Sequence, residues 1–423
     1  MLLRFRASNH LSFRGLQEVS FVASSLKERK GYLIDCAAAP NNSVVPAAVV
    51  YGANASGKSN LIDAMQTMCA MVLRSHTRGD PGGGVARQPF RLDPACLQAA
   101  TQFDIDFVAE GTRYHYGFKA SDKAFVSEWL DVYPKAHRRL AFARDSSEFA
   151  FGRWLKGQNS SIAKLTRPNS LFLSAAAQNG HEQLSKVFAY FRSIQIVRDI
   201  AVPGTELWTR LAGEEPDRRV IAFLGRLGTG VVDFRRSEAK NSELFLKLVR
   251  PMAAVGESTD VFLEKLGTDG FEPVVELVHR GRDNEPISLD LDRESAGTRR
   301  LLAVMGIVYR SLDEGTPVLM DELDASLHTH ASEAVLRLFC SEQSNPRGAQ
   351  LLATTHDTNL MRSSSLRRDQ LWFTQKDAEG STQIYPLTDF KTRRGDNFEL
   401  GYLQGRYGAV PFEDLGSPRA TSG

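Results

Sequence analysis

Residues 52–59 read GANASGKS, and this motif is the strongest indication of the fold in the sequence. It matches GxxxxGK[ST] in full, between the apolar run PAAVVY at 46–51 and the helical pattern NLIDAMQTMCAMVL at 60–73. A buried strand, a glycine-rich turn and a helix N-terminus together surround a phosphate with backbone N–H groups and the positive end of a helix dipole. The sequence therefore predicts a nucleotide-binding loop at the end of a parallel strand.

The residues of this loop have expected roles toward ATP and Mg²⁺. Lys58 would reach the β and γ phosphates and take part in catalysis, and Ser59 would ligate the magnesium ion. The surrounding backbone and side chains would hold the nucleotide. The positions expected to contact it are Gly52, Asn54, Ala55, Ser56, Gly57, Lys58, Ser59 and Asn60.

Two acids follow a second apolar strand near the other end of the chain. The run VLM at 318–320 leads directly into Asp321 and Glu322. A carboxylate at the end of a parallel strand can hold the water shell of a magnesium ion, and the next carboxylate can orient or deprotonate the attacking water. We therefore predict Asp321 as a metal ligand and Glu322 as a catalytic residue. A solvated acidic turn is the alternative, and the phosphate loop in the same chain argues against it.

His356 is a further catalytic candidate. It follows the apolar strand in QLLATTHDTNL at 350–360, where its imidazole would touch the γ phosphate or the attacking water. The alternative is a capped loop residue with no catalytic role. The order of the motifs along the chain favours the catalytic interpretation.

The segment ESAGT at 294–298 precedes a helical pattern and resembles a degenerate signature loop of ABC-type ATPases. Ser295 and the Gly297 N–H would bind a γ phosphate, in the site of a facing subunit rather than in their own. The alternative is that Ser295 simply caps a core helix. Asp324 would lie in the loop that crosses the dimer interface and would contribute to nucleotide binding.

The order of these patterns predicts an α/β fold, an ABC-type P-loop ATPase head in which helices flank a mixed sheet. The alternating stretches at 101–120 and 123–133 add an antiparallel β lobe. We expect four regions along the chain. They are residues 1–180 with the phosphate loop and β lobe, an inserted helical lobe at 181–268, the second half of the head at 269–412, and a disordered tail at 413–423.

Composition limits the partners of the chain. The 52 basic and 50 acidic side chains leave a net charge of +2, which gives no overall field to attract nucleic acid or a membrane. One hypothesis is that a local patch of arginines binds DNA. The alternative is that these arginines lie on an ordinary solvated surface. The members of the patch would be Arg362, Arg367, Arg368, Arg393 and Arg394.

Four scattered cysteines form no CxxC pair, and neither a leader peptide nor an apolar stretch of spanning length is present in the sequence. We therefore expect a cytoplasmic protein that does not associate with a membrane.

The motifs together resemble a known group, the ABC-type AAA-family ATPases of prokaryotic phage-defence and restriction-linked operons, similar to RloA and the AbiL ATPase. Several of the motifs also resemble the heads of SMC and RecF-like ATPases. The stretches that carry the resemblance are FRASNHLSF, GANASGKSN, QPFRLD, FDIDF, YHYGF, ESAGTRRLL, VLMDELDASLH, TTHDTNL and GYLQGRYGAVPF.

This resemblance implies a head-to-tail homodimer, or a larger oligomer, that assembles around ATP and Mg²⁺. It would sense infection and control a separately encoded effector protein, often a nuclease. The resemblance also implies that Gln88 acts as the residue that couples magnesium to the lobes. The alternative function is a RecF-like or SMC-like ATPase that binds DNA in repair or chromosome maintenance, although the sequence shows none of the long heptad arms that SMC proteins carry.

Overall fold

The computed structural model describes residues 1–26, 32–134, 137–198, 217–237, 274–393 and 395–410. The chain divides into two compact units. The first contains residues 1–198, 312–324 and 332–423, and the second contains residues 199–311 and 325–331. Within the described ranges, no helix is both long enough and apolar enough to cross a membrane.

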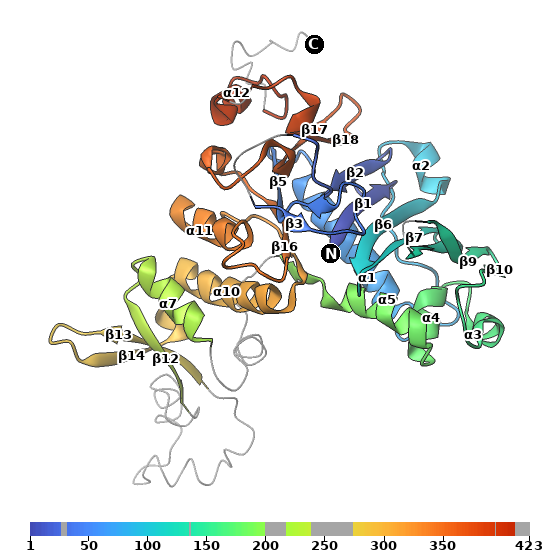
Figure 1. Ribbon diagram of the computed structural model, residues 1–423, viewed down its shortest axis with the longest axis horizontal. Coiled ribbons are helices and arrows are strands. Elements are labelled where there is room, and N and C mark those ends of the chain that lie inside the picture. The colour runs from blue at the N-terminus through green and yellow to red at the C-terminus, as the bar shows by residue number, and fades with distance from the viewer. Residues whose placement is uncertain (27–31, 135–136, 199–216, 238–273, 394, 411–423) are drawn as a thin grey trace, which may run out of the picture. The chain divides into compact units, whose positions relative to one another are not determined.

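A six-stranded sheet in the first unit carries the phosphate loop (Figure 1). The first five strands of its order run parallel, and the last is antiparallel to its neighbour. Every residue of β5, β15 and β16 is buried, which explains why these strands read as continuous apolar runs. In order across the sheet, the strands are β11 (Gln195–Val197), β15 (Pro317–Met320), β16 (Gln350–Thr354), β5 (Ala47–Gly52), β17 (Leu371–Lys376) and β18 (Thr382–Pro386).

A seven-stranded antiparallel sheet forms the predicted β lobe in the same unit. Phe103, Ile105 and Phe107 lie on one face and are fully buried. Asp104 and Asp106 lie on the other face, where they are buried beneath the arginines that pair with them. This alternation is typical of a sheet covered on one face. In order, the strands are β10 (Glu148–Phe151), β9 (Arg139–Asp145), β8 (Phe125–Tyr133), β7 (Thr112–Ala120), β6 (Thr101–Ala109), β1 (Leu2–Ser8) and β2 (Gln17–Ser20).

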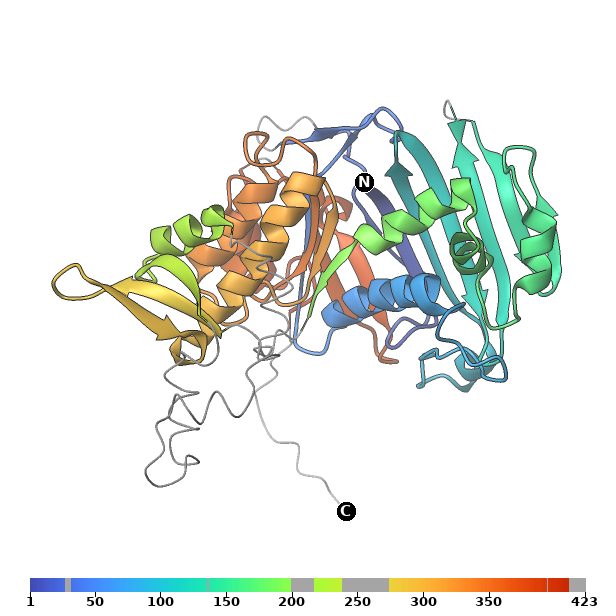
Figure 2. The same cartoon turned by 90° about the horizontal axis from the view of Figure 1, so that it is seen from below.

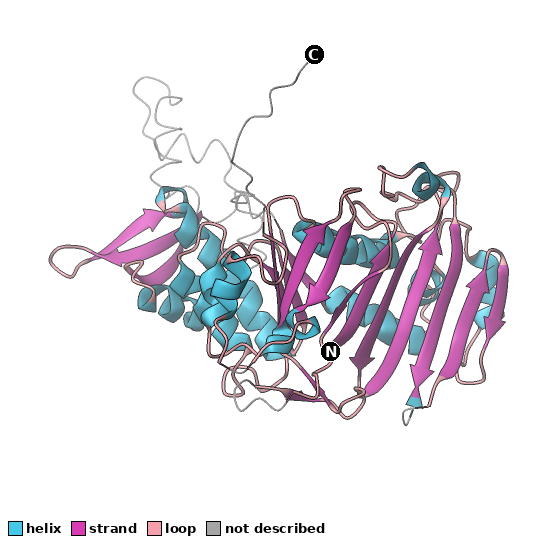
Figure 3. Cartoon of the chain, turned by 90° about the horizontal axis from the view of Figure 1, so that it is seen from above, coloured by secondary structure: helices cyan, strands magenta, loops and turns pink. Residues whose placement is uncertain are grey.

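Helices α1 (Lys58–Arg74) and α5 (Glu182–Ser193) cover the apolar face of this β lobe. Figures 2 and 3 view the molecule from opposite sides, and they show these helices against one face and strands facing the viewer on the other. Leu61, Met65 and Met68 lie on the buried side of α1, at helical spacing. One hydrophobic core therefore joins the phosphate-loop strand, α1 and the β lobe.

The remaining described elements of the first unit are short or lie at its periphery. They are β3 (Ile34–Asp35), β4 (Ser43–Val44), α2 (Pro94–Gln98), α3 (Asn159–Leu165), α4 (Phe172–Gln178), most of α11 (Thr329–Phe339), η5 (Thr358–Arg362), η6 (Arg368–Gln370), η7 (Leu387–Asp389) and α12 (Phe398–Leu403).

The second unit contains a three-stranded antiparallel sheet and helices. Its described elements are α7 (Arg218–Arg226), β12 (Val231–Ser237), β13 (Val274–Arg280), β14 (Pro286–Asp290), η4 (Leu291–Arg293) and most of α10 (Ala296–Glu314).

The predicted α/β fold is confirmed, since the mixed sheet, the antiparallel lobe and the phosphate-loop helix are all present. The region at 181–268 was expected to be an inserted helical lobe, and the described part of it differs from that expectation. Helix α5 belongs to the first unit, and residues 231–237 form a strand, as their β-branched and aromatic content favours. Residues 199–216 and 238–268 of that lobe lie outside the described residues, as does the tail expected at 413–423.

Candidate nucleotide-binding site

The phosphate loop connects the end of β5 to the start of α1, as expected from its sequence. Gly57 has a φ of 107°, a left-handed conformation that glycine adopts without strain. The helix begins at Lys58, and none of the described residues accepts a hydrogen bond from the backbone N–H of Lys58 or Ser59. These donors, at the positive end of the α1 dipole, are suited to an anion.

Lys58 turns back onto its own loop. The side chain is 5% exposed, and Nζ donates to the carbonyl oxygens of Gly52 at 2.8 Å and Ala53 at 3.0 Å. Burial lowers the pKa of Lys58 to about 8, against the attraction of Asp324, Asp321 and Glu322. A phosphate would replace the two carbonyl oxygens as the partner of this ammonium group.

A chain of hydrogen bonds joins the loop to the two predicted acids. Ser59 Oγ donates to Asp321 Oδ1 at 3.1 Å, and Thr354 Oγ1 donates to the same oxygen at 2.6 Å. The Thr354 hydroxyl also accepts the Glu322 N–H at 2.8 Å. These residues come from three neighbouring parallel segments whose carboxyl ends meet at one edge of the sheet. Thr354 therefore links the two acids, a role that the sequence analysis missed.

Glu322 has a φ of 52°, which places a residue other than glycine in the left-handed region. Such a conformation costs of order 1–3 kcal/mol and persists only where the surroundings impose it. The bond from the Glu322 N–H to Thr354 is one such constraint. The strain is located at the residue that we predicted from sequence as the base for the attacking water.

Asp324 has partners inside its own unit. Its carboxylate accepts the Thr355 hydroxyl at 2.7 Å and the His356 backbone N–H at 3.2 Å. The His356 side chain itself is exposed. Asp324 thus positions the loop that carries the predicted catalytic histidine, in addition to its attraction for Lys58.

The hairpin of β17 and β18 packs directly against the phosphate loop. A Cβ atom at Gly52 would lie 2.4 Å from Thr374 Oγ1, and one at Gly57 would lie 2.2 Å from Thr382 Oγ1. Thr382 Oγ1 also donates to the Ser56 carbonyl at 2.7 Å. Two of the motif's glycines are therefore required by close packing as well as by backbone conformation.

The remaining loop positions are held from two sides. Ser56 Oγ lies 2.6 Å from Thr374 Oγ1, and Asn60 donates to Ser12 Oγ at 2.6 Å. The Ala53 N–H donates to the carbonyl of Ala409 at 2.9 Å, so the GRYGAV segment contacts the first turn of the loop. Asn54 and Ala55 are exposed, where a nucleotide would approach. These long-range contacts have no local sequence signal.

Ser295 and Gly297 lie in the second unit at the start of α10. Ser295 Oγ accepts the Thr298 N–H at 3.0 Å, which is a helix N-cap. A Cβ atom at Gly297 would lie 2.8 Å from the carbonyl of Ser326, in the short segment at 325–331 of the same unit. Ser295 therefore caps α10, and the Gly297 N–H lies near the N-terminus of that helix; the role of both residues toward a facing subunit stays a prediction.

Gln88 is exposed, and its backbone carbonyl accepts the Leu11 N–H at 2.7 Å. In the described structure its side chain makes no hydrogen bond to Ser59 or Asp321. Any role of Gln88 toward magnesium stays a prediction.

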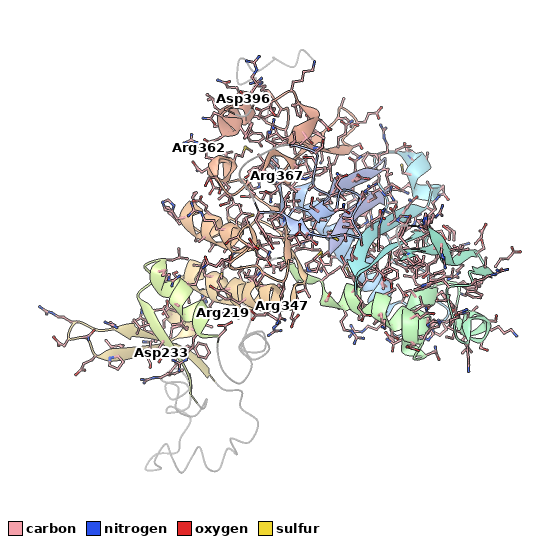
Figure 4. All side chains as sticks on the ribbon, in the orientation of Figure 1. Arg219, Asp233, Arg347, Arg362, Arg367 and Asp396 are labelled. Atoms are coloured by element: carbon pink, nitrogen blue, oxygen red, sulfur yellow. The ribbon has the colours of Figure 1, made fainter. Side chains whose placement is uncertain are left out.

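The hypothesis of a five-arginine patch is wrong for one member. Arg367 is 3% exposed and pairs with Asp369 at 2.9 Å, while Arg362 pairs with Glu399. Figure 4 labels both arginines. A guanidinium group that is buried in an ion pair with a carboxylate is not available to bind the phosphates of DNA. Arg394 lies outside the described residues.

The donor set at the edge of the sheet fits magnesium. Ser59 and Asp321 present hard oxygen atoms on adjacent segments, which is the ligand type that Mg²⁺ prefers beside phosphate oxygens. Within the described ranges, no group of three or more His, Cys, Asp or Glu side chains forms an all-protein metal site. This donor set suits an ion that completes its coordination with nucleotide and water.

Comparisons with known proteins give the following results. Residues 47–362 match the family described as "AAA domain, putative AbiEii toxin, Type IV TA system". Comparison with proteins of curated function gives no match.

The solved structures that are similar to the chain include the following three. The SMC head domain from Thermotoga maritima has a TM-score of 0.39 and 14% identity, covering 91% of this chain and 98% of that one. An Smc head with an extended coiled coil, bound to the C-terminal domain of ScpA derived from Pyrococcus furiosus, has a TM-score of 0.40 and 14% identity, covering 91% and 96%. A structure of the recombination mediator protein RecF has a TM-score of 0.37 and 14% identity, covering 91% and 98%.

Proposed function

The chain belongs to this family of AAA domains, and on that premise we propose that it binds and hydrolyses ATP with Mg²⁺ in a site that a second copy of the chain completes. The observation that carries the proposal is the hydrogen-bonded series from Ser59 through Asp321 and Thr354 to Glu322, beside the buried Lys58.

Each residue of this series has a distinct task in hydrolysis. Lys58 and the N–H groups at the start of α1 would hold the β and γ phosphates. Ser59 and Asp321 would hold Mg²⁺, which when bound offsets the charge that develops on the phosphates. Glu322, fixed in its strained conformation, would orient and deprotonate the attacking water. Asp324 would place the His356 loop beside the γ phosphate.

The partner copy would supply Ser295 and the Gly297 N–H, because these groups open a helix N-terminus and anions bind there. ATP would then join two chains head to tail, and hydrolysis would loosen the pair. We expect Glu322→Gln to bind ATP without hydrolysing it and to accumulate as a dimer, and Lys58→Ala to stay monomeric. Light scattering with ATP and Mg²⁺ would show this, and the same mass for both variants would contradict the proposed assembly.

We further propose that the dimer regulates a separately encoded effector protein, a nuclease, in antiphage defence. The toxin–antitoxin description of the family supports a system of more than one component. The test is co-purification with the product of a neighbouring gene, with and without ATP. Capture that depends on ATP and is lost in Lys58→Ala supports nucleotide control, and capture that is equal in all cases contradicts it.

The alternative is a RecF-like or SMC-like ATPase that binds DNA directly. The family match is compatible with it, but the burial of Arg367 removes one charge from the only basic patch that the sequence suggested. Duplex binding whose affinity falls steeply with salt would favour this alternative, since phosphate neutralisation releases counterions. Absence of binding at low salt would exclude it.

A further inference from the structure

Arg198 lies between α1 and the predicted metal ligand Asp321. We propose that Arg198 keeps free divalent cations out of the magnesium site, so that the metal enters only together with nucleotide. The inference rests on the proposed function, because it concerns the Mg²⁺ that serves ATP. Arg198 belongs to neither the phosphate-loop motif nor the acid motif, and this inference assigns it a role in metal selection.

The topology of the sheet brings Arg198 to this position. Strand β11 pairs in parallel with β15, with Val197 opposite Met320, and the Asp321 N–H donates to the Val197 carbonyl at 2.9 Å. Arg198 and Asp321 are therefore the next residues on neighbouring strands. Arg198 Nε lies 3.6 Å from Asp321 Oδ2.

Helix α1 anchors the other end of the guanidinium. Arg198 Nη1 donates to Asp63 Oδ2 at 2.6 Å and to Gln66 Oε1 at 3.1 Å. Ser59, Asp63 and Gln66 occupy positions i, i+4 and i+7 of α1 and so share one face of the helix. That face contacts Asp321 directly through Ser59 and indirectly through Arg198.

A buried histidine holds this anchor in place. The fully buried His10 has Nε2 2.9 Å from Asp63 Oδ1. Hydrogen bonds from His10 and Arg198 lower the pKa of Asp63 to about 2, so this carboxyl group is ionised at neutral pH. Arg198 is therefore shared between two carboxylates and fixed at one end.

The charge arrangement decides what Asp321 can bind. Its Oδ1 already accepts the hydroxyls of Ser59 and Thr354, and its Oδ2 faces the guanidinium. Even in the dielectric of water, a divalent cation about 5 Å from a guanidinium is repelled enough to weaken binding roughly tenfold. The phosphates of a nucleotide add negative charge beside both cations and offset this repulsion.

The experiment measures metal binding without nucleotide. Mn²⁺ serves as the probe, because its paramagnetic resonance signal reports bound and free metal directly. We expect Arg198→Gln to bind Mn²⁺ roughly tenfold more tightly than the wild type, and Arg198→Lys to stay near the wild type because it keeps the charge. Asp63→Asn should weaken Mn²⁺ binding, since Arg198 would then pair with Asp321 alone.

Two controls assign the signal. Arg192→Gln removes an arginine that stacks on Phe188 in the same unit and should leave Mn²⁺ binding unchanged. Adding Asp321→Asn to Arg198→Gln should abolish the tighter binding. Mn²⁺ affinity in Arg198→Gln that is equal to or weaker than in the wild type would overturn the inference.

ADP binding by the wild type in EDTA separates this result from the proposed function. If the wild type binds no nucleotide, the proposed function fails. If it binds ADP but Arg198→Gln leaves metal affinity unchanged, only the role of Arg198 fails.

Discussion

Replacing Gly57 by alanine tests whether the β17–β18 hairpin shapes the phosphate loop. Gly57 has a φ of 107°, and a Cβ atom there would lie 2.2 Å from Oγ1 and 2.8 Å from Cγ2 of Thr382. Real Cβ atoms do not approach other heavy atoms so closely, so either the loop or the hairpin has to move. The substitution therefore combines backbone strain with a steric clash.

The two costs can be separated. A positive φ at a residue other than glycine costs about 1–3 kcal/mol, and overpacking a closed site adds about 1–3 kcal/mol. Gly57→Ala should thus lower the free energy of unfolding by about 2–6 kcal/mol. Gly111 is the matched control, because its φ is 73° but a Cβ atom there would have no neighbour within 4 Å. Gly111→Ala should show the backbone cost alone.

Urea unfolding and ATP titration together give the measurement. We expect Gly57→Ala to lose both stability and ATP affinity, and Gly111→Ala to bind ATP as the wild type does. Adding Thr382→Ala removes the two nearest atoms that the new Cβ would meet and leaves Ser12 Oγ at 3.0 Å, so it should restore part of the loss. Equal stability losses in the two glycine variants, with equal ATP affinity, would refute the packing argument.

Three further predictions concern the site and its surroundings. Burial lowers the pKa of Lys58 to about 8, so the free protein loses this charge above pH 8. ATP affinity should therefore fall by up to about tenfold per pH unit above that value. Calorimetric titrations at several pH values should show this decrease in the wild type but not in Lys58→Ala. Thr354→Val removes the hydroxyl between Asp321 and Glu322, so kcat should fall by about 10–100-fold while KM for ATP changes little. Thr354→Ser keeps the hydroxyl and should retain the wild-type kcat. A normal kcat in the valine variant would contradict the linking role of Thr354. Arg367→Ala leaves the buried Asp369 without its cationic partner and should lower the free energy of unfolding in urea by about 3 kcal/mol. Replacing the exposed Arg393 by alanine should cost less than about 0.5 kcal/mol, and similar costs for the two variants would contradict the burial of Arg367.

The sequence predicted the parts of the site that depend on local pattern. The phosphate loop, the strand before it and the helix after it form one continuous segment, and the strand before Asp321 is equally continuous. Such segments carry both their conformation and their chemistry in neighbouring residues. The location of the loop and of both acids could therefore be predicted without the structure.

What the sequence could not show depends on residues far apart in the chain. Thr382 contacts the phosphate loop from more than 300 positions away, and Arg198 reaches Asp321 only because β11 pairs with β15. Of these residues, only Thr354 could have been predicted from a general rule. It ends a strand that is parallel to the other two, and polar residues at the carboxyl ends of parallel strands meet at one edge of the sheet. The strand at 231–237 was missed because helical spacing in its surroundings outweighed seven residues of strand pattern.

If a second chain completes each nucleotide site, two inactive variants should restore activity when they are mixed. Lys58→Ala lacks the phosphate-binding ammonium, and Ser295→Ala lacks the group supplied to the partner. In a mixed dimer, one of the two sites has both groups intact. We therefore predict that each variant alone is nearly inactive and that an equal mixture regains about a quarter to a half of wild-type ATPase activity. Random pairing would put one working site in half of the dimers, and if only mixed pairs form, every dimer carries one. A mixture no more active than the separate variants, or full activity of Ser295→Ala alone, would contradict the claim.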